Sequence, residues 1–336
     1  MPERDSPWKL PEQYDRIGGI KRPHEKDLLA KSNVVGVGVG NKYVAGEDTG
    51  TPCIVVMVST KLPRAELEDA DLVPSTLDDV PTDVVETGLI QADGDFNARL
   101  RPAPGGTSVS HRNGPYTGTL GTGCVDEEQP KFGRRKYYLL SCNHVLANHN
   151  QAIAGDYVLQ PGVGDGGTYP ADIVGRLDRW VPIQFCTPTP TGFICTANYA
   201  DAAIALTTLN RVNREIHWLG YPRRFPPSGY LTYGPGTRVL KMGTTSGLTE
   251  GEVTAVSAVT IVNYPLAGGQ VAMFKDVIVT TRMSKPGDSG AIACEPDYGV
   301  ALGMVFASGT HGPRSATFLN PVWWIESLLD ISIAPA

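Results

Sequence analysis

Long apolar runs are missing from this 336-residue sequence. Residues 1–19 are polar and mixed in charge, without the apolar segment behind a basic start that marks a secretory signal peptide. No stretch stays apolar over the roughly 20 residues that cross a bilayer. From these two absences we expect a cytoplasmic protein with no membrane partner.

A charge excess of the kind that binds nucleic acid is also missing. The sequence has 29 Lys and Arg against 35 Asp and Glu, a net charge of −6, and no basic run stands out. Nucleic acids and anionic membranes are bound by clustered basic side chains. We therefore expect neither of them as a partner.

Cysteine is scarce and shows no metal-binding spacing. The six cysteines are scattered, at Cys53, Cys124, Cys142, Cys186, Cys195 and Cys294. In a reducing compartment we expect them to be buried free thiols. Cys186 and Cys195 flank a Thr/Pro loop, and a disulfide between these two stays open as an alternative.

Glycine and proline, in contrast, are abundant, with 38 and 27 residues. This content indicates many turns and is typical of all-β proteins. After residue 117, short strand-like runs follow one another closely, a spacing that favours β-barrels or a sandwich. The expected strands are 117–125, 136–142, 156–160, 172–178, 202–208, 237–241, 251–262, 271–281, 291–294 and 299–307. Residues 321–329 begin with proline, carry an apolar face and predict a closing helix.

Residues 1–105 have a different pattern. We expect an extended arm over 1–22, then the order helix, strand, strand, helix, strand of a small α+β domain. These elements are predicted at 23–32, 33–40, 53–59, 64–70 and 82–88. A change in composition over 91–117, towards Arg, Pro, Gly, Ser and His, marks a linker, and we place the domain boundary between residues 105 and 106.

The first domain, residues 1–105, carries no motif of its own. It could inhibit or assist the folding of the second domain, form a homo-oligomer, recruit substrate or serve as a packed structural appendage. These alternatives stay open.

Ser289 lies in a turn between Gly287 and Gly290. A serine hydroxyl attacks only when a base takes its proton and donors stabilise the developing oxyanion. The glycines permit a sharp turn, which leaves the amides of Gly287 and Ser289 free to point at one spot. This segment therefore predicts a nucleophile together with an oxyanion hole, and the base has to come from elsewhere.

His144 is the candidate base because it follows the strand-like run 137–142 and precedes a short helical turn. Asp201 is the candidate group to orient it. It precedes an apolar run, and a buried carboxylate needs a partner such as an imidazole N–H. Asp172 and Asp178 are weaker alternatives because they lie in polar stretches.

Cys142 raises a second interpretation of this region. It lies two residues before His144, so on a strand the two side chains share a face and could bind a metal as a pair. No third or fourth ligand lies nearby, and a structural cysteine is therefore favoured. We expect no metal and no organic cofactor.

Three segments resemble the signature segments of chymotrypsin-fold (trypsin-like) serine peptidases. They are Ser-Cys-Asn-His-Val-Leu-Ala around His144, Tyr-Ala-Asp-Ala-Ala-Ile-Ala around Asp201 and Pro-Gly-Asp-Ser-Gly around Ser289, and their order along the chain is the same. Residues 241–251 resemble the Gly/Thr hairpin of bacterial members, and 302–308 resemble the strand on which substrate docks. The layout with an α+β domain in front also resembles unsecreted bacterial trypsin-like proteins.

The resemblance covers roughly residues 115–330 and implies a mainly β protein with two β-barrels, which acts as a serine endopeptidase on a protein or peptide. Ser289 attacks the scissile carbonyl, His144 takes and returns the proton, and Asp201 holds the correct tautomer. The amides of Gly287 and Ser289 form the oxyanion hole. Two alternatives stay open: a protease-fold scaffold that binds peptides or partner proteins without catalysis, and an esterase.

The resemblance also implies a specificity pocket. By position, Met283 forms its base, and Phe306, Ala307 and Ser308 form one wall. Members of the family that cleave after Lys or Arg carry a carboxylate at this base. Because Met283 has no charge, we expect cleavage after a medium-sized apolar residue.

Asp288 is the residue that, in secreted relatives, receives the new terminal amine made by activating cleavage. Arg16–Gly19 resembles such a cleavage site, but a whole domain separates it from His144. We therefore expect an internal side chain or amide to satisfy Asp288, without proteolytic activation.

Overall fold

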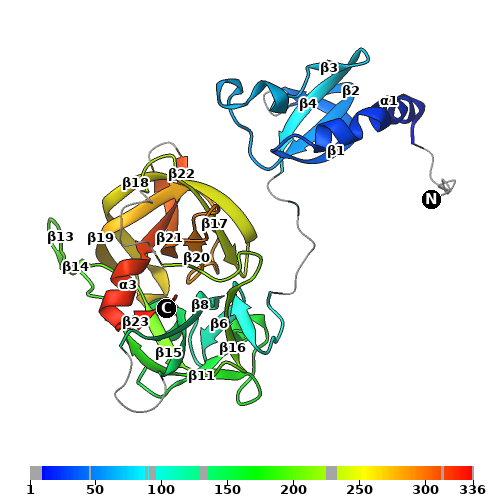
Figure 1. Ribbon diagram of the computed structural model, residues 1–336. Helices are drawn as coiled ribbons and strands as arrows, with labels where there is room; N and C mark the ends of the chain where they lie inside the picture. The colour runs from blue at the N-terminus through cyan, green and yellow to red at the C-terminus, as the bar shows by residue number, and fades with distance from the viewer. Residues whose placement is uncertain are drawn as a thin grey trace. The chain divides into compact units, whose positions relative to one another are not determined.

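Figure 1 shows the computed structural model of the chain, which describes residues 10–44, 47–87, 90, 96–128, 135–224, 233–311 and 314–334. The chain divides into two compact units, Met1–Ala92 and Asp93–Ala336. Sequence analysis placed this boundary at residue 105. It lies earlier because β5 (Ala103–Gly105) pairs with β16 (Val212–Ile216) of the second unit.

In the residues that the structure describes, the first unit has one α-helix packed on a four-stranded sheet, an α+β arrangement. The sheet has the order β1-β2-β4-β3, formed by Val34–Val44, Glu47–Val58, Val80–Glu86 and Thr76–Leu77. Residues Arg64–Glu66 and Asp69–Asp71 form two short 3-10 turns where a helix over 64–70 was expected. The helix expected there is thus wrong, whereas β1, β2 and β4 confirm the three predicted strands, with shifted ends.

The helix α1 spans Glu12–Leu29, so the expected extended arm over 1–22 is wrong from residue 12 onwards. Gly18, Gly19 and Pro23 are weak helix formers, and for this reason the sequence did not predict a helix over residues 12–22. Ile17 and Leu28 bury their side chains against strand residues such as Ile54 and Val56. This tertiary packing outweighs the low propensity.

The first barrel of the second unit closes on itself. Its sheet runs β8-β9-β15-β11-β10-β6-β7, and only Leu120 and Gly121 separate β7 from β8 along the chain, so these two act as one strand of a six-stranded barrel. The strands are β6 (Ser108–His111), β7 (Gly118–Thr119), β8 (Thr122–Asp126), β9 (Tyr137–Ser141), β10 (Tyr157–Leu159), β11 (Ile173–Trp180) and β15 (Ala203–Leu206). A short strand near the end of the chain, β23 (Ile331–Ser332), adds to β8.

The second barrel also has six strands, in the order β19-β18-β17-β20-β21-β22, and β22 pairs back to β19. The strands are β17 (Arg238–Gly243), β18 (Gly247–Tyr264), β19 (Gln270–Thr281), β20 (Ile292–Cys294), β21 (Ala301–His311) and β22 (Arg314–Pro321). Every strand expected after residue 117 is present. β22 was not predicted, because the small and polar residues along it, such as Ser315 and Thr317, do not show a clear apolar run.

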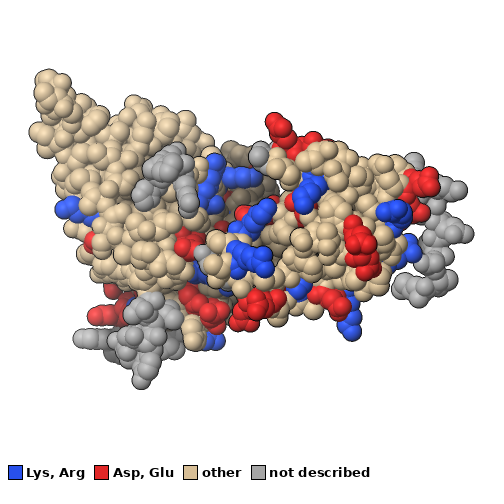
Figure 2. All heavy atoms as spheres, turned by 90° about the horizontal axis from the view of Figure 1, so that it is seen from above, with Lys and Arg blue, Asp and Glu red and all other residues tan. Residues whose placement is uncertain are grey.

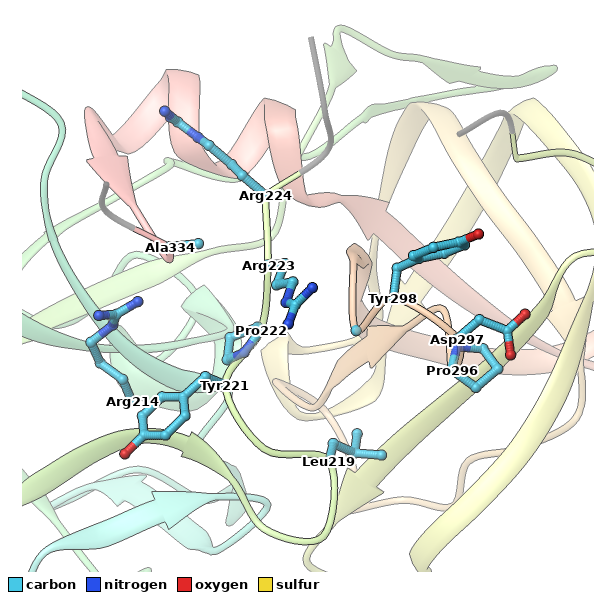
Figure 3. Close-up of a pocket in the computed structure, with 11 residues that line it drawn as sticks. Arg214, Leu219, Tyr221, Pro222, Arg223, Arg224, Pro296, Asp297, Tyr298 and Ala334 are labelled. Carbon is cyan, nitrogen blue, oxygen red and sulfur yellow. The ribbon is translucent and has the colours of Figure 1, made fainter. Parts of the chain in front are cut away.

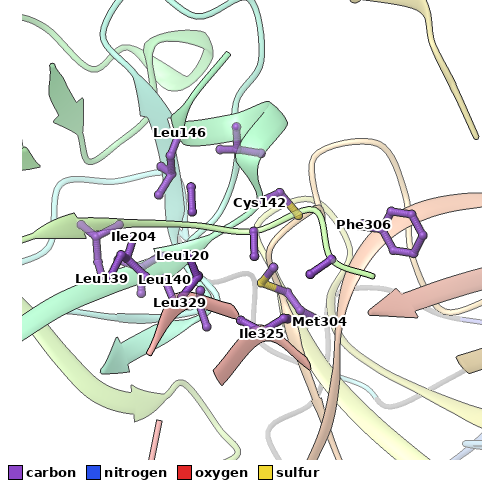
Figure 4. Close-up of a cluster of buried hydrophobic side chains, with 14 of the residues drawn as sticks. Leu120, Leu139, Leu140, Cys142, Leu146, Ile204, Met304, Phe306, Ile325 and Leu329 are labelled. Carbon is purple, nitrogen blue, oxygen red and sulfur yellow. The ribbon is translucent and has the colours of Figure 1, made fainter. Parts of the chain in front are cut away.

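One apolar cluster joins the first barrel, the second barrel and the C-terminal helix (Figure 4). Leu140 and Ile204 come from the first barrel and Met304 from the second, while Ile325 and Leu329 come from α3 (Val322–Leu329). The closing helix predicted over 321–329 is therefore confirmed. The cluster fixes the two barrels to each other around a shared core.

A small exposed hairpin, β12 (Thr187–Thr189) with β13 (Gly192–Ile194), leaves the first barrel just before the parallel strand β14 (Ala197–Asn198). A disulfide joins Cys186 to Cys195 across its base. The expectation of free thiols is thus wrong for this pair and right for the other four cysteines, which are buried and unbridged. Among the helices that the structure describes, none is long and apolar enough to span a membrane.

Candidate active site

The candidate base and its orienting group lie at neighbouring strand ends of the first barrel. β9 ends at Ser141, and His144 follows in the single turn of α2 (Asn143–Leu146). Ser141 pairs with Ala203, the first residue of the antiparallel strand β15. The chain just before β15 therefore lies beside the chain just after β9, and this places Asp201 against His144.

A hydrogen bond of 2.6 Å joins the Nδ1 atom of His144 to Oδ2 of Asp201, and the His144 amide donates to Oδ1 at 3.1 Å. Asp201 is fully buried, and His144 is 7% exposed. Burial acts to raise the pKa of Asp201, but the charge and hydrogen bonds of His144, together with a hydrogen bond from Tyr264, outweigh it and lower this pKa. An ionised Asp201 can only accept, so Nδ1 of His144 carries the proton and Nε2 is left for the nucleophile.

Ser289 lies in the turn just before β20, where Gly287 and Gly290 have φ angles of 103° and 102°. Glycine adopts these angles without strain. A Cβ atom on Gly290 would lie 2.1 Å from the carbonyl oxygen of Thr119, so a larger residue does not fit. The Thr119 amide donates to the Ser289 carbonyl at 2.7 Å and fastens the turn to the first barrel.

Two amides of this turn are free to bind an oxyanion. The amides of Asp288, Gly290 and Ala291 each donate to a backbone carbonyl, at 2.8 to 3.0 Å. Within the described part of the chain, the amides of Gly287 and Ser289 donate to no protein atom. Donors that are already oriented and unpaired can stabilise a developing negative charge without reorganisation.

Ser289 makes no hydrogen bond to His144 in the part of the chain that the structure describes. The structure therefore pairs two of the three residues singled out in the sequence and leaves the third contact open. Hydrogen bonds between a nucleophile and its base are often long without substrate and tighten when substrate binds.

Asp288, next to the candidate nucleophile, is held from inside the second barrel. The ammonium of Lys241 lies 3.1 Å from its Oδ2 atom, and both side chains are fully buried. The amides of Thr245, Ser246 and Lys285 also donate to this carboxylate. Ile17, the residue of the apparent activation site, is instead packed in α1 of the first unit. The expectation of an internal partner for Asp288 is confirmed.

The residues expected to form a specificity pocket are spread over two apolar clusters. Met283 is buried among Val239, Val253 and other residues of the second barrel. Phe306 packs in the main cluster against Phe274, with ring centroids 4.8 Å apart. Their shared pocket therefore stays a prediction. The remaining two residues follow on β21, with Ala307 half-buried and Ser308 exposed.

Cys142, His144 and Asp201 bring a thiol, a ring nitrogen and a carboxylate within 4.8 Å of one another, a set that could hold a metal. Hydrogen bonds already account for each group, because Nδ1 pairs with the carboxylate and the thiol donates to the Val305 carbonyl. Burial also raises the pKa of Cys142 well above its ordinary value, which keeps the thiol protonated. We therefore assign Cys142 to the protein core.

His149 is a buried residue near the site that sequence reasoning passed over. It is 4% exposed, and its ring stacks on that of His144 at 6.0 Å. Burial and, to a lesser degree, His144 lower the pKa of His149 to about 4. Asn148, His149 and Asn150 all have positive φ angles, of 46°, 56° and 71°. The asparagines on both sides of His149 were the signal in the sequence that this segment forms a left-handed turn, because asparagine tolerates positive φ angles.

A side-chain network holds this left-handed turn. Asn143, next to His144, donates to the Asn150 side chain at 2.8 Å and to the Val181 carbonyl at 2.7 Å. Asn150 in turn exchanges hydrogen bonds with the backbone of Ile183. The network connects the chain on both sides of His149 to the irregular segment after β11.

A pocket of about 650 Å³ lies apart from these residues (Figure 3). Its walls are the segment that connects the two barrels and the turn between β20 and β21. It is lined by Arg214, Leu219, Tyr221, Pro222, Arg223, Arg224, Pro296, Asp297, Tyr298, Gly299 and Ala334. None of the residues singled out in the sequence as site residues borders it.

No protein-family model matches this sequence, and no curated protein matches it either. Among solved structures, protease A of Thermobifida fusca is similar, with 16% identity and a TM-score of 0.42, over 69% of this chain and 98% of that protein. A chymotrypsin of Cellulomonas bogoriensis has 18% identity and a TM-score of 0.41, over 69% and 98% of the two chains. A Nocardiopsis protease has 18% identity and a TM-score of 0.43, over 68% and 96%.

At these identities no residue role transfers from the solved structures, and the strand pairings decide the fold. The second unit has two closed six-stranded barrels. His144 and Asp201 belong to the first barrel, and the Ser289 turn belongs to the second. The mainly β fold with two barrels, which the resemblance to chymotrypsin-like serine peptidases implied, is confirmed.

Proposed function

We propose that the second unit is a serine endopeptidase that uses His144, Asp201 and Ser289. The observation that carries the proposal is the hydrogen bond of 2.6 Å between His144 and buried Asp201, beside a serine turn with two unpaired amides. Each part is what acyl transfer needs: an oriented base, a nucleophile and donors for the oxyanion.

In the proposed reaction, Nε2 of His144 takes the proton of the Ser289 hydroxyl as its oxygen attacks the scissile carbonyl. The amides of Gly287 and Ser289 bind the negative charge that develops on the carbonyl oxygen. Asp201 stabilises the imidazolium, which gives its proton to the leaving amine. Water then attacks the acyl-enzyme with His144 again as base, and Ser289 is released.

Three observations favour catalysis over a scaffold that only binds peptides. Asp201 is kept ionised in a fully buried position, which costs free energy that a binding surface does not need. The Gly287 and Ser289 amides stay unpaired, although the neighbouring amides of the same turn are satisfied. The Lys241–Asp288 pair holds this turn from inside the second barrel, so the proposed site needs no activating cleavage.

For the substrate we propose a protein or peptide cleaved after a medium-sized apolar residue, as expected from uncharged Met283. On the face in Figure 2, Lys and Arg side chains are interspersed with Asp and Glu, and neither the basic nor the acidic residues form a wide continuous patch. Such a mixed surface supports a polypeptide substrate rather than nucleic acid. For the first unit we propose a role in assembly of a homo-oligomer, which sedimentation of the protein with and without residues 1–92 tests.

The location of the protein is a separate proposal. We keep the cytoplasm as the proposed location, and the Cys186–Cys195 disulfide is the observation against it, because disulfides persist in oxidising compartments. Fractionation of cells that make the protein, followed by alkylation of thiols before and after reduction, decides between the two.

A fluorophosphonate probe tests the catalytic proposal, because it labels only serines activated by a base. We expect labelling of the wild type and of Ser327→Ala, which removes an exposed serine of α3, and no labelling of Ser289→Ala. Hydrolysis of a peptide library against simple esters then separates a peptidase from an esterase. An unlabelled but folded wild type contradicts the proposal.

A further inference from the structure

Tyr264 contacts the candidate triad from the second barrel. It is the last residue of β18, at the tip of the β18–β19 hairpin. Its hydroxyl lies 2.9 Å from Oδ2 of Asp201, the same oxygen that faces Nδ1 of His144 at 2.6 Å. Because an ionised carboxylate only accepts, the Tyr264 hydroxyl is the donor.

We propose that Tyr264 is a positioning residue that sets how Asp201 faces His144 and how strongly Asp201 holds its ring. The inference rests on the proposed function. The hydroxyl occupies a lone pair of Oδ2 and draws charge from the atom that stabilises the imidazolium. It also adds a second contact to the oxygen that His144 meets, so this O–H group contributes to both the orientation and the basicity of the carboxylate.

The ring of Tyr264 is enclosed, so the hydroxyl can be removed without disturbing the packing around it. Tyr264 is 4% exposed. Aromatic rings surround it at centroid distances of 5.6 Å (His149), 5.7 Å (Phe185), 6.0 Å (His144) and 6.5 Å (Phe274). The hairpin tip is held from the first barrel as well, since the Leu266 amide donates to the Tyr116 hydroxyl at 3.3 Å.

The other titratable groups around the His144–Asp201 pair stay uncharged near neutral pH. Burial raises the pKa of Tyr264 and of the Cys142 thiol well above their ordinary values. Burial also raises the pKa of Tyr116, and it lowers the pKa of His149 to about 4. These neighbours therefore keep a constant charge between about pH 5 and 8, so a change in the His144 ring signal over that range does not come from them.

The test is Tyr264→Phe, read by NMR titration of the His144 ring in a Ser289→Ala background. With the competing donor gone, Asp201 attracts the imidazolium more strongly, so we expect the titration midpoint of His144 to move to higher pH. In the active protein we expect kcat to fall about tenfold or more with little change in KM. A purely structural role would not move the midpoint.

Tyr116→Phe is the matched control, because the Tyr116 ring also contacts His144 but its hydroxyl faces the Leu266 amide. In the same Ser289→Ala background, the titration midpoint of His144 in Tyr116→Phe should equal the midpoint with Tyr116 intact. If Tyr264→Phe does not fold, 3-fluorotyrosine at position 264 makes a stronger donor without loss of bulk, and the midpoint should then fall.

A midpoint that stays at the wild-type value in Tyr264→Phe, whatever the rate, overturns the inference, and so does an unchanged midpoint with the fluorinated residue. The titration needs no turnover. A wild type that hydrolyses no peptide would end the proposed function, while the midpoints would still decide the role of Tyr264.

Discussion

Replacement of Lys241 by methionine tests how the nucleophile turn is held. The Lys241 ammonium lies 3.1 Å from Oδ2 of Asp288, and neither side chain is exposed. Burial lowers the pKa of Lys241, and the charge of Asp288 opposes this shift. Lys241→Met keeps an unbranched side chain as far as Cε and removes the charged Nζ atom. Asp288 then keeps its hydrogen bonds from backbone amides and from the Ser246 hydroxyl, but loses its counter-ion.

Removal of one partner from a buried ion pair costs about 3–5 kcal/mol of stability. Because the hydrogen bonds to Asp288 remain, we expect the lower end, about 3 kcal/mol. Urea unfolding followed by tryptophan fluorescence measures this in the second unit, where four of the five tryptophans lie: Trp180, Trp218, Trp323 and Trp324. A shift of Asp288 also moves the amides of Gly287 and Ser289, so kcat should fall by about 100-fold.

Two controls make the result specific. Lys275→Met removes an exposed lysine of β19 and should leave stability within about 0.5 kcal/mol of the wild type. The double variant Lys241→Met/Asp288→Asn removes both charges and should recover much of the lost stability, because no unpaired charge stays buried. If Lys241→Met is as stable and as active as Lys275→Met, the reasoning is refuted.

Three further predictions follow from the same region. His149 has its pKa lowered to about 4 by burial and the neighbouring imidazole. The unfolded chain therefore binds its proton first, and stability should fall on acidification from about pH 6.5 towards 4. His149→Asn should flatten that fall by up to about 1.4 kcal/mol per pH unit, measured by urea unfolding. Gly290→Ala should abolish serine labelling because its Cβ would lie 2.1 Å from a carbonyl oxygen, whereas Gly269→Ala, which also has positive φ but open space, should keep it. Cys186 and Cys195 should react with iodoacetamide in the folded protein only after reduction, and labelling before reduction would contradict the bridge.

The residues of the candidate site could be singled out in the sequence because each has a local signature. A serine between glycines, a histidine after an apolar strand and an aspartate before another are short patterns, and their order adds information. Strands with short turns between them also follow from local composition. The pairing of β9 with β15 then brings His144 and Asp201 together without further signals.

The partners of these residues could not be predicted, because they come from distant parts of the chain. Tyr264 lies 63 residues from Asp201, and nothing near either one marks the pair. Likewise, the sequence predicted that an internal group would contact Asp288, but not which one. That this group is Lys241 depends on the position of β17 relative to the Ser289 turn. The helix α1 was missed for the opposite reason: its local signals at Gly18, Gly19 and Pro23 were misleading, and packing overrode them.

Closure of both barrels has a consequence for how the site can be aligned. Because each barrel closes on itself, little strand pairing joins the two in the described part of the chain: β14, which lies between β11 and β15 in the sequence, pairs with β19 over only two residues and gives few contacts for aligning the barrels. Apart from the shared apolar core, individual hydrogen bonds carry that task, such as those from Thr119 to Ser289, from Cys142 to Val305 and from Asp201 to Asn320. In each of these bonds one end is a residue of the proposed triad or lies within two residues of one. The other end is Thr119, Val305 or Asn320. Alignment of His144 with Ser289 thus depends on a small number of contacts, and a slight rotation of one barrel would separate the members of the proposed triad while every strand stayed intact.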